Sequence, residues 1–238
     1  MSTPANTAQP KTSPVKTGAE DSIRRGPPVE VVRYGPGKRI NHWVTAISLI
    51  LLLLSGLAMF HPSLFFLTEL FGGGQMTRWI HPWIGVVLFI SFFILFAQLW
   101  KLNIPNRDDV KWASQISDVI GGNEENLPEL GKYNAGQKFI FWGMASLIIV
   151  LIVTGIMAWE QYFGHLTSIP AQRIALLVHS LAAVAIILVF ILHVYAAIWT
   201  RGTIRAMTRG TVTGGWAWRH HRKWLKDMAG RGRIDSTK

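Results

Sequence analysis

Four apolar stretches constrain the fold of this chain more than any other feature of its sequence. They occupy residues 41–60, 79–100, 139–159 and 173–199. Each is close to the roughly 20 residues that a helix needs to cross the ~30 Å hydrocarbon core of a bilayer. Because lipid offers the backbone no hydrogen-bond partners, each stretch must satisfy its own amides and carbonyls. We therefore expect an all-α membrane protein built as a four-transmembrane-helix bundle.

Positive charges predict the orientation of this bundle. Of the 24 Lys and Arg residues, seven precede residue 41, five lie between residues 101 and 138, and ten follow residue 199. The other two connections carry Arg78 and Arg173 alone. By the positive-inside rule both termini are cytoplasmic. The net charge of +11 is then explained by topology and by attraction to anionic membrane lipid, not by nucleic-acid binding.

The composition of the chain divides it into three parts. Residues 1–30 are rich in Ser, Thr, Pro, Lys and Ala and lack the apolar core of a signal peptide, so we predict a disordered N-terminal tail. Residues 31–200 form the membrane domain, and residues 201–238 are expected to be a basic cytoplasmic tail, solvated near lipid headgroups. The absence of cysteine excludes disulfides, cysteine-ligated iron–sulfur clusters and covalent c-type haem.

Histidines near the helix ends carry the functional signal. His179 and His193 are 14 residues apart, which is about 21 Å of helix and places both side chains on one face within about 40°. On the predicted topology His42 lies at the depth of His193, near the cytoplasmic face. His81 lies at the depth of His179, near the outer face. The depths therefore predict two pairs, His42–His193 inside and His81–His179 outside.

Each predicted pair suits a b-type haem. Two neutral imidazoles from facing helices can supply both axial ligands of the iron, whereas zinc takes three or four ligands at one point. One histidine could be hydrogen-bonded inside the bundle, but four at matching depths favour a functional role. Gly56, 14 residues after His42, could leave room for the outer porphyrin or could serve ordinary helix packing. The remaining histidines, His61, His165, His220 and His221, are expected to face solvent.

Short motifs connect the chain with a known family. They are R-I-N-H-W at 39–43, I-H-P at 80–82, G-N-E at 122–124, G-K-Y-N-A-G-Q-K at 131–138, V-H-S at 178–180 and H-V-Y at 193–195. With them the chain resembles the cytochrome b (gamma) subunit of membrane-bound respiratory formate dehydrogenase. Hydrogenase-linked cytochromes b share the histidine motifs, whereas the segment at 131–138 is more specific.

The resemblance implies a role in an electron-transfer complex of the bacterial inner (plasma) membrane. An iron–sulfur (beta) subunit and a catalytic subunit (alpha) with molybdenum or tungsten would lie outside. This multi-pass chain would anchor them and would have no formate-oxidising site of its own. Electrons would pass from the outer haem to the inner haem, so that residues 31–200 form a dihaem cytochrome b domain. A quinone would then accept the electrons near the inner haem.

The loop at residues 131–138 is the expected quinone site, because it begins the third helix at the depth of the inner haem. Asn134 and Gln137 offer amide donors to a quinone carbonyl. The alternative role of Asn134 is helix N-capping, and positive-inside topology explains Lys132 and Lys138 without a ligand. Two other functions fit parts of the pattern: the cytochrome b of another quinone-linked oxidoreductase, such as a hydrogenase or thiosulfate reductase, and a haem-free membrane scaffold.

Overall fold

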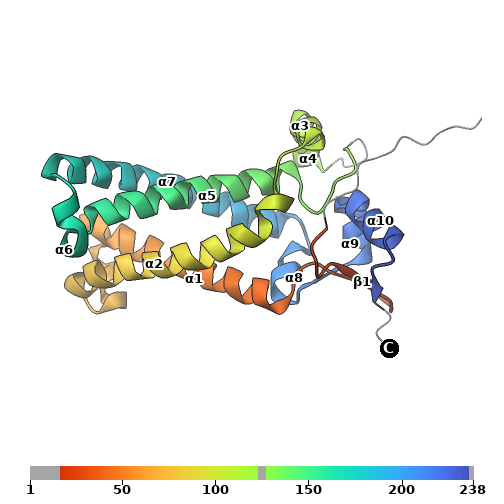
Figure 1. The fold of residues 1–238 in the computed structure, drawn as a ribbon, viewed down its shortest axis with the longest axis horizontal. Coiled ribbons are helices and arrows are strands. Elements are labelled where there is room, and N and C mark those ends of the chain that lie inside the picture. The colour runs from red at the N-terminus through yellow and green to blue at the C-terminus, as the bar shows by residue number, and fades with distance from the viewer. Residues whose placement is uncertain (1–16, 123–126, 236–238) are drawn as a thin grey trace, which may run out of the picture.

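A computed structural model describes residues 17–122 and 127–235, which form a long helical bundle with a folded domain at one end (Figure 1). We call this domain the cap and define it as residues 17–35, 129–133 and 200–235. The end of the bundle that carries the cap is the cap side, and the opposite end is the far side.

The bundle consists of the four helices that hydropathy predicted. They are α1 (Pro36–Phe60), α2 (Gly74–Leu99), α5 (Ala135–Ala158) and α7 (Ile169–Trp199), and all four are long and apolar enough to cross a membrane. Their C-terminal ends match the predicted ends within one residue, but each helix begins four or five residues before its predicted start. Three of the first turns contain glycine together with charged or amide residues, which lower the local hydropathy: PGKR in α1, GQMT in α2 and AGQK in α5.

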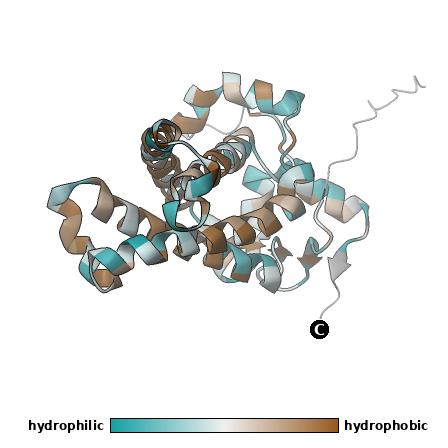
Figure 2. Cartoon of the chain, turned by 60° about the vertical axis from the view of Figure 1, so that its left-hand side comes forward, coloured by the Kyte–Doolittle hydropathy of each residue, from teal (hydrophilic) through white to brown (hydrophobic). Residues whose placement is uncertain are grey.

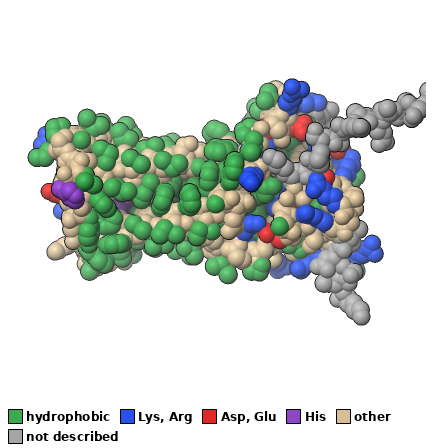
Figure 3. All heavy atoms as spheres, viewed as in Figure 1, with side chains coloured by type: hydrophobic (Ala, Val, Ile, Leu, Met, Phe, Trp, Pro, Cys, Tyr) green, Lys and Arg blue, Asp and Glu red, His purple; other side chains and the backbone are tan. Residues whose placement is uncertain are grey.

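The helices pack as two pairs. α1 packs along α2, and α5 packs along α7, while contacts between α2 and α5 and between α1 and α7 join the pairs. One buried aliphatic residue from each helix forms a layer at the middle of the bundle: Leu49, Leu88, Ile148 and Ile186. Large apolar side chains cover the outer surface of the bundle (Figure 3), and the long helices consist mostly of hydrophobic residues (Figure 2). This surface is the one that lipid would contact.

Short helical elements connect the long helices. On the far side, η1 (Pro62–Phe71) lies between α1 and α2, and α6 (Glu160–Phe163) with η3 (Gly164–Leu166) lies between α5 and α7. Between α2 and α5 the chain forms η2 (Trp100–Leu102), α3 (Arg107–Ser114) and α4 (Ile116–Gly121).

A small sheet organises the cap. Its strands are β1 (Ser22–Arg24), β2 (Glu30–Val32), β3 (Thr211–Thr213) and β4 (Ile234–Asp235), in the spatial order β3-β2-β1-β4. β1–β2 and β2–β3 are antiparallel, and β4 runs parallel to β1. The helices α8 (Thr203–Thr208), α9 (Gly214–His220) and α10 (Arg222–Gly230) complete the cap. Charged side chains gather at this end of the molecule (Figure 3).

The cap corrects three of our predictions. The described part of the predicted N-terminal tail, residues 17–30, is not disordered, because it supplies β1 and part of β2; residues 1–16 lie outside the described residues. Residues 201–235 are not a solvated tail, because α10 buries Trp224 and Met228 completely; residues 236–238 lie outside the described residues. The chain is also not all-α, because strands from both segments pair with one another. Such pairing joins distant segments, which neither composition nor helical periodicity reveals.

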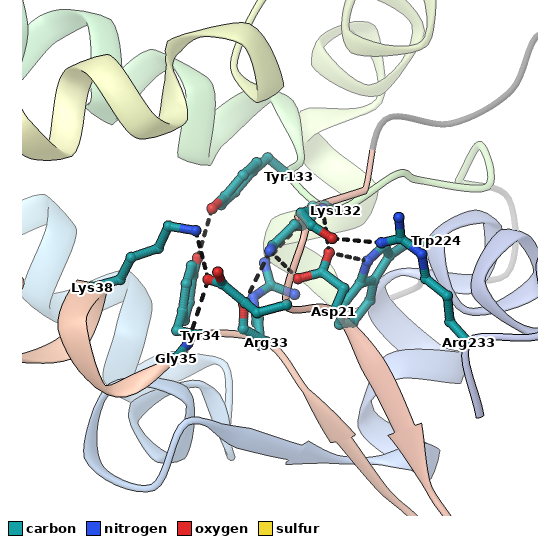
Figure 4. A network of polar contacts seen from close by, with 11 residues as sticks. Asp21, Arg33, Tyr34, Gly35, Lys38, Lys132, Tyr133, Trp224 and Arg233 are labelled. Carbon is teal, nitrogen blue, oxygen red and sulfur yellow. Dashed lines mark hydrogen bonds and ion pairs between the residues drawn. The ribbon is translucent and has the colours of Figure 1, made fainter. Parts of the chain in front are cut away.

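The cap interior holds charged and polar groups (Figure 4). Lys132 Nζ lies 2.5 Å from Asp21 Oδ1, and Trp224 Nε1 donates to the same carboxylate at 3.0 Å. Arg33 donates to the carbonyl of Lys132 at 2.6 Å, and its guanidinium lies against the rings of Tyr34, Tyr133, Trp216 and Trp224. Burial lowers the pKa of Lys132, and the Asp21 carboxylate opposes that shift.

His221 is part of this interior, so the expectation that it faces solvent is wrong. It is 1% exposed, and its Nδ1 lies 2.7 Å from the Gly131 carbonyl. Burial first, and then the charge of Arg33, lowers its pKa well below the ordinary value, so the ring is neutral near pH 7. His61 and His165 are exposed as predicted, and His220 is half-buried.

Candidate functional site

The four histidines on the long helices meet in the two pairs that the sequence predicted. On the cap side, His42 of α1 faces His193 of α7, with ring centroids 6.3 Å apart and ring planes inclined by 48°. On the far side, His81 of α2 faces His179 of α7 at 6.4 Å and 66°. We call them the cap-side pair and the far-side pair. α7 contributes one histidine to each, so this helix connects the two sites.

The spacing of each pair fits two axial ligands of one haem iron. A first-row metal ion binds an imidazole nitrogen at about 2 Å, and that nitrogen lies about 1 Å from the ring centroid, so two axial rings have centroids roughly 6 Å apart. The observed separations of 6.3 and 6.4 Å agree with this value. The two rings of each pair come from different helices, so an iron ion held by both rings would lie between the helices.

Hydroxyl groups orient both histidines of the far-side pair. Ser55 Oγ lies 2.7 Å from Nδ1 of His81, and Thr154 Oγ1 lies 2.9 Å from Nδ1 of His179. Each hydroxyl donates its own hydrogen to a carbonyl of the preceding helical turn, Ser55 to Leu51 at 2.8 Å and Thr154 to Val150 at 2.7 Å. With its hydrogen donated within the helix, each hydroxyl accepts from the imidazole. The hydrogen is then on Nδ1, and Nε2 keeps its lone pair for a metal.

The cap-side pair is supported differently. Nδ1 of His42 is buried and has no hydrogen-bond partner within the described parts of the chain. The neighbouring polar residues of α1 bond to α2 instead of to a histidine. Asn41 donates to the Ser91 carbonyl at 2.8 Å, and Thr45 Oγ1 lies 3.1 Å from Ser91 Oγ. These bonds join the two helices beside His42 without fixing its ring tautomer.

Glycines adjoin the far-side rings. A Cβ atom on Gly56 would lie 3.5 Å from Cε1 of His81, and one on Gly155 would lie 3.4 Å from Cε1 of His179, which are ordinary van der Waals distances. Both roles considered for Gly56, room for a porphyrin and helix packing, stay predictions. Each glycine directly follows the hydroxyl residue that bonds that ring.

The mid-bundle aliphatic layer lies halfway between the two pairs. Leu49 is seven residues from His42, Leu88 is seven residues from His81, and Ile186 is seven residues from both histidines of α7. Seven residues of helix span about 10 Å. The space between the pairs is therefore filled by packed apolar side chains.

Asn134 and Gln137 form a capping box at the start of α5, on the cap side. The Gln137 amide donates to Asn134 Oδ1 at 2.8 Å, and the Asn134 amide donates to Gln137 Oε1 at 3.2 Å. The N-capping role that we considered for Asn134 is thus present in the structure. It uses the side-chain oxygens of both residues, and the side-chain NH₂ groups are not part of the box.

Both lysines of this segment form buried ion pairs, so positive-inside topology does not account for them alone. Lys132 pairs with Asp21 in the cap. Lys138 Nζ lies 2.6 Å from Asp109 Oδ2 and donates to the Ile104 carbonyl at 3.2 Å. These contacts tie the start of α5 to the N-terminal segment and to α3.

An apolar groove of about 440 Å³ runs along the first turns of α5. Its floor contains Phe139 and Trp142, and the Lys138–Asp109 pair borders it. Asn134 and Gln137 are not among its lining residues. Ala135 and Lys138 line the groove, so it includes the end of the predicted quinone loop.

Sequence reasoning missed Ser55 and Thr154. Both precede a glycine at the depth of the far-side pair, in the dipeptides Ser55–Gly56 and Thr154–Gly155. The role predicted for this region was assigned to Gly56 and not to the hydroxyl that precedes it. A hydroxyl at the depth of a proposed histidine ligand, on the adjacent helix, was the available signal.

Comparisons with known proteins agree with this geometry. Residues 33–210 match the family described as prokaryotic cytochrome b561. The chain is 45% identical over 198 residues to the formate dehydrogenase cytochrome b556(fdo) subunit of Escherichia coli K12, covering 83% of this chain and 93% of that protein. It is 40% identical to the formate dehydrogenase cytochrome b556 subunit of Haemophilus influenzae, covering 83% of each. It is 38% identical to the nitrate-inducible cytochrome b556(Fdn) subunit of E. coli K12, covering 80% and 88%.

Proposed function

Since this chain belongs to the prokaryotic cytochrome b561 family, among the formate dehydrogenase cytochrome b subunits, we propose that it carries electrons through two b-type haems from the enzyme's other subunits to a quinone. The observation that supports two haems is the presence of two histidine pairs at two depths, each with the spacing of axial ligands. A b-type haem, when bound, gains and loses single electrons at its iron.

The proposed orientation places the cap in the bacterial cytoplasm. Most Lys and Arg residues lie in or beside the cap, and the positive-inside rule assigns that side to the cytoplasm. The far-side pair, His81 and His179, then lies near the outer face of the inner membrane. The cap-side pair, His42 and His193, lies near the cytoplasm. Electrons would enter at the far-side pair and leave at the cap-side pair.

The proposed direction of electron flow determines on which side the partner subunits would bind. An iron–sulfur subunit would deliver electrons at the far side, and a catalytic subunit with molybdenum or tungsten would oxidise formate. The chain would anchor both in the membrane. Its own residues hold and orient the cofactors, and its apolar mid-bundle layer keeps water from the path between the histidine pairs.

The quinone would bind at the start of α5, on the cap side. The groove beside Phe139 and Trp142 offers an apolar path from the lipid to this point. The capping box leaves the side-chain NH₂ groups of Asn134 and Gln137 available as donors to a quinone carbonyl. Protons for the quinol would come from the cytoplasmic side.

Difference spectra test the donor and the haems together. Anaerobic membranes containing this chain and its native partner subunits are treated with formate and then with dithionite. Reduction of b-haem absorbance by formate is the expected result. Reduction by dithionite alone would retain the haems and reject the formate donor. Membranes without b-haem absorbance would support a haem-free scaffold.

Two variants separate quinone binding from helix capping at Asn134. Asn134→Asp keeps a good N-cap acceptor but loses the amide donor, whereas Asn134→Ala loses both. Loss of one hydrogen bond to the quinone should slow quinol formation by about tenfold in both variants, while haem reduction by formate persists. Wild-type quinone kinetics in Asn134→Asp would reject the assigned role.

A further inference from the structure

The two histidine pairs differ in what their Nδ1 atoms contact. Both Nδ1 atoms of the far-side pair lie within hydrogen-bond distance of a hydroxyl. Each hydroxyl also contacts a carbonyl of its own helix, and when it donates there it accepts from the ring. Nδ1 of His42 in the cap-side pair is buried and has no partner in the described residues. The bundle therefore supports its two candidate haem sites unequally.

We propose that Ser55 and Thr154 are positioning residues for the far-side haem, which fix the tautomer of His81 and His179 and hold that haem at the lower reduction potential of the two. The inference rests on the proposed function, because it requires a haem at each pair. It concerns a property that the ligand positions alone do not determine.

The physical reason is the effect of a hydrogen bond on the ligand. An imidazole that donates from Nδ1–H becomes a stronger electron donor at Nε2. Stronger donation stabilises the more positively charged ferric iron and lowers the potential, since hydrogen bonding around the ligands is one of the means by which a protein tunes a haem. Two such bonds act on the far-side site.

Local packing shows that these contacts are built into the helices. Ser55 and Thr154 are both buried, at 0% and 7% exposure, so water does not compete for the hydroxyls. Gly56 and Gly155 follow them and lie beside the rings, where even a Cβ atom would make an ordinary van der Waals contact. The same arrangement occurs twice, on α1 beside α2 and on α5 beside α7. Both histidines of the far-side pair therefore have a hydroxyl partner.

The consequence is a direction for electron flow. A lower potential at the far-side haem makes transfer to the cap-side haem downhill. The hydroxyls would thus favour movement from the side where the proposed donor docks toward the proposed quinone site.

Redox titration of the purified complex, followed by haem absorbance and by electron paramagnetic resonance of the ferric haems, tests the proposal. In Ser55→Ala and Thr154→Val the lower of the two midpoint potentials should shift to a more positive value, and the g-values of that haem should change. The other haem should be unaffected. Ser55→Thr and Thr154→Ser keep the hydroxyl, so each of these variants should retain the wild-type midpoint potential.

Ser91→Ala is the matched control. The Ser91 hydroxyl also donates to a carbonyl of the preceding turn, Leu88 at 3.0 Å, but it bonds Thr45 and no histidine, so its removal should leave both potentials unchanged. Should Ser55→Ala lose a haem, the shape-preserving Thr154→Val decides the question. Two haems with unchanged potentials in Thr154→Val would overturn this inference and leave the proposed function intact. Fewer than two haems in the wild-type complex would overturn the proposed function itself.

Discussion

The cap buries charged side chains within its core, and the middle of the bundle does not. At the middle of the bundle the buried layer is aliphatic, and the outer surface is also apolar. The cap has an exposed charged surface, yet it encloses Asp21, Lys132 and Arg33, all nearly inaccessible. Four histidines and a few hydroxyls are the main polar groups that the bundle directs inward, and they lie at the candidate haem sites.

The difference follows from the two solvents. Between helices in lipid the hydrophobic effect contributes little, so packing and a few polar contacts hold the bundle. In water the cap gains from apolar burial around Trp224 and Met228, and it must compensate every charge that it buries. Polar contacts at the far-side histidines are therefore expected to serve the site, and those inside the cap to serve the fold. The predictions below test that distinction.

The largest effect is expected from a ligand change in the bundle. His193→Leu should remove the haem of the cap-side pair entirely and abolish quinone reduction, because an apolar side chain cannot bind iron. The far-side haem should remain, since its ligands are His81 and His179. Pyridine haemochrome quantification would measure one haem per chain in place of two. Retention of two haems would show that the pairing is wrong.

The largest effect in the cap is expected from breaking its buried ion pair. Lys132→Met leaves the Asp21 carboxylate buried without its cation, which typically costs about 3–5 kcal/mol. Hydrogen exchange of the α10 amides should report unfolding of the cap while the haem spectrum persists. Loss of haem together with cap structure would contradict the distinction that polar contacts inside the cap serve the fold of the cap and not the haem sites.

A double variant sharpens this test. Lys132→Met combined with Asp21→Asn removes both charges, and the oxygen of the introduced amide can still accept from Trp224 in place of the carboxylate that does so now. The cap of the double variant should be more stable than that of Lys132→Met alone. Equal destabilisation would mean that the charges do not interact as their 2.5 Å separation indicates.

The same contrast explains what the sequence could predict. Hydropathy located the C-terminal ends of all four long helices within one residue, because an apolar run in lipid has one available structure. Helical spacing also paired the four histidines correctly in space, since His179 and His193 share one helix and depth follows from residue count. Their role as haem ligands stays a proposal.

The cap escaped prediction because its order comes from long-range pairing. β1 and β2 have three residues each, too few for a strand pattern, and they gain partners from β3 and β4 about 180 or more residues later in the chain. His221 sits in a basic, polar stretch and becomes buried only because distant residues cover it. Ser55 and Thr154 were missed for a related reason: a hydroxyl in a membrane helix has no distinctive spacing.

Acidification should weaken the cap. Burial holds the pKa of His221 well below 6.5 in the folded cap, so the unfolded chain binds the proton first. The stability contribution is complete above about pH 6.5 and is lost as the pH falls from there toward the folded pKa, by at most about 1.4 kcal/mol per pH unit. Arg33, Lys132 and His220 lie near the ring and oppose its protonation.

Hydrogen exchange of α9 and α10, corrected for intrinsic rates, would measure this dependence between pH 7.5 and 5.5. Protection should fall by up to about tenfold per pH unit in the wild-type cap. His221→Gln retains a donor for the Gly131 carbonyl without a titrating ring, so its protection should change less with pH. An equally steep decline in His221→Gln would assign the pH dependence to another group.

The smallest effect is expected at the cap surface. Glu129 lies 2.7 Å from Lys226 Nζ and 3.9 Å from Arg222 Nη1, with all three side chains about half exposed. Water screens such pairs, so Glu129→Gln should reduce cap stability by less than about 1 kcal/mol, and added salt should reduce the difference further. The same hydrogen-exchange measurement compares this variant with Lys132→Met. If Glu129→Gln reduced cap stability as much as Lys132→Met, the cap would depend on its surface charges as much as on its buried ones. The contrast between cap and bundle would then rest on charge alone and not on burial.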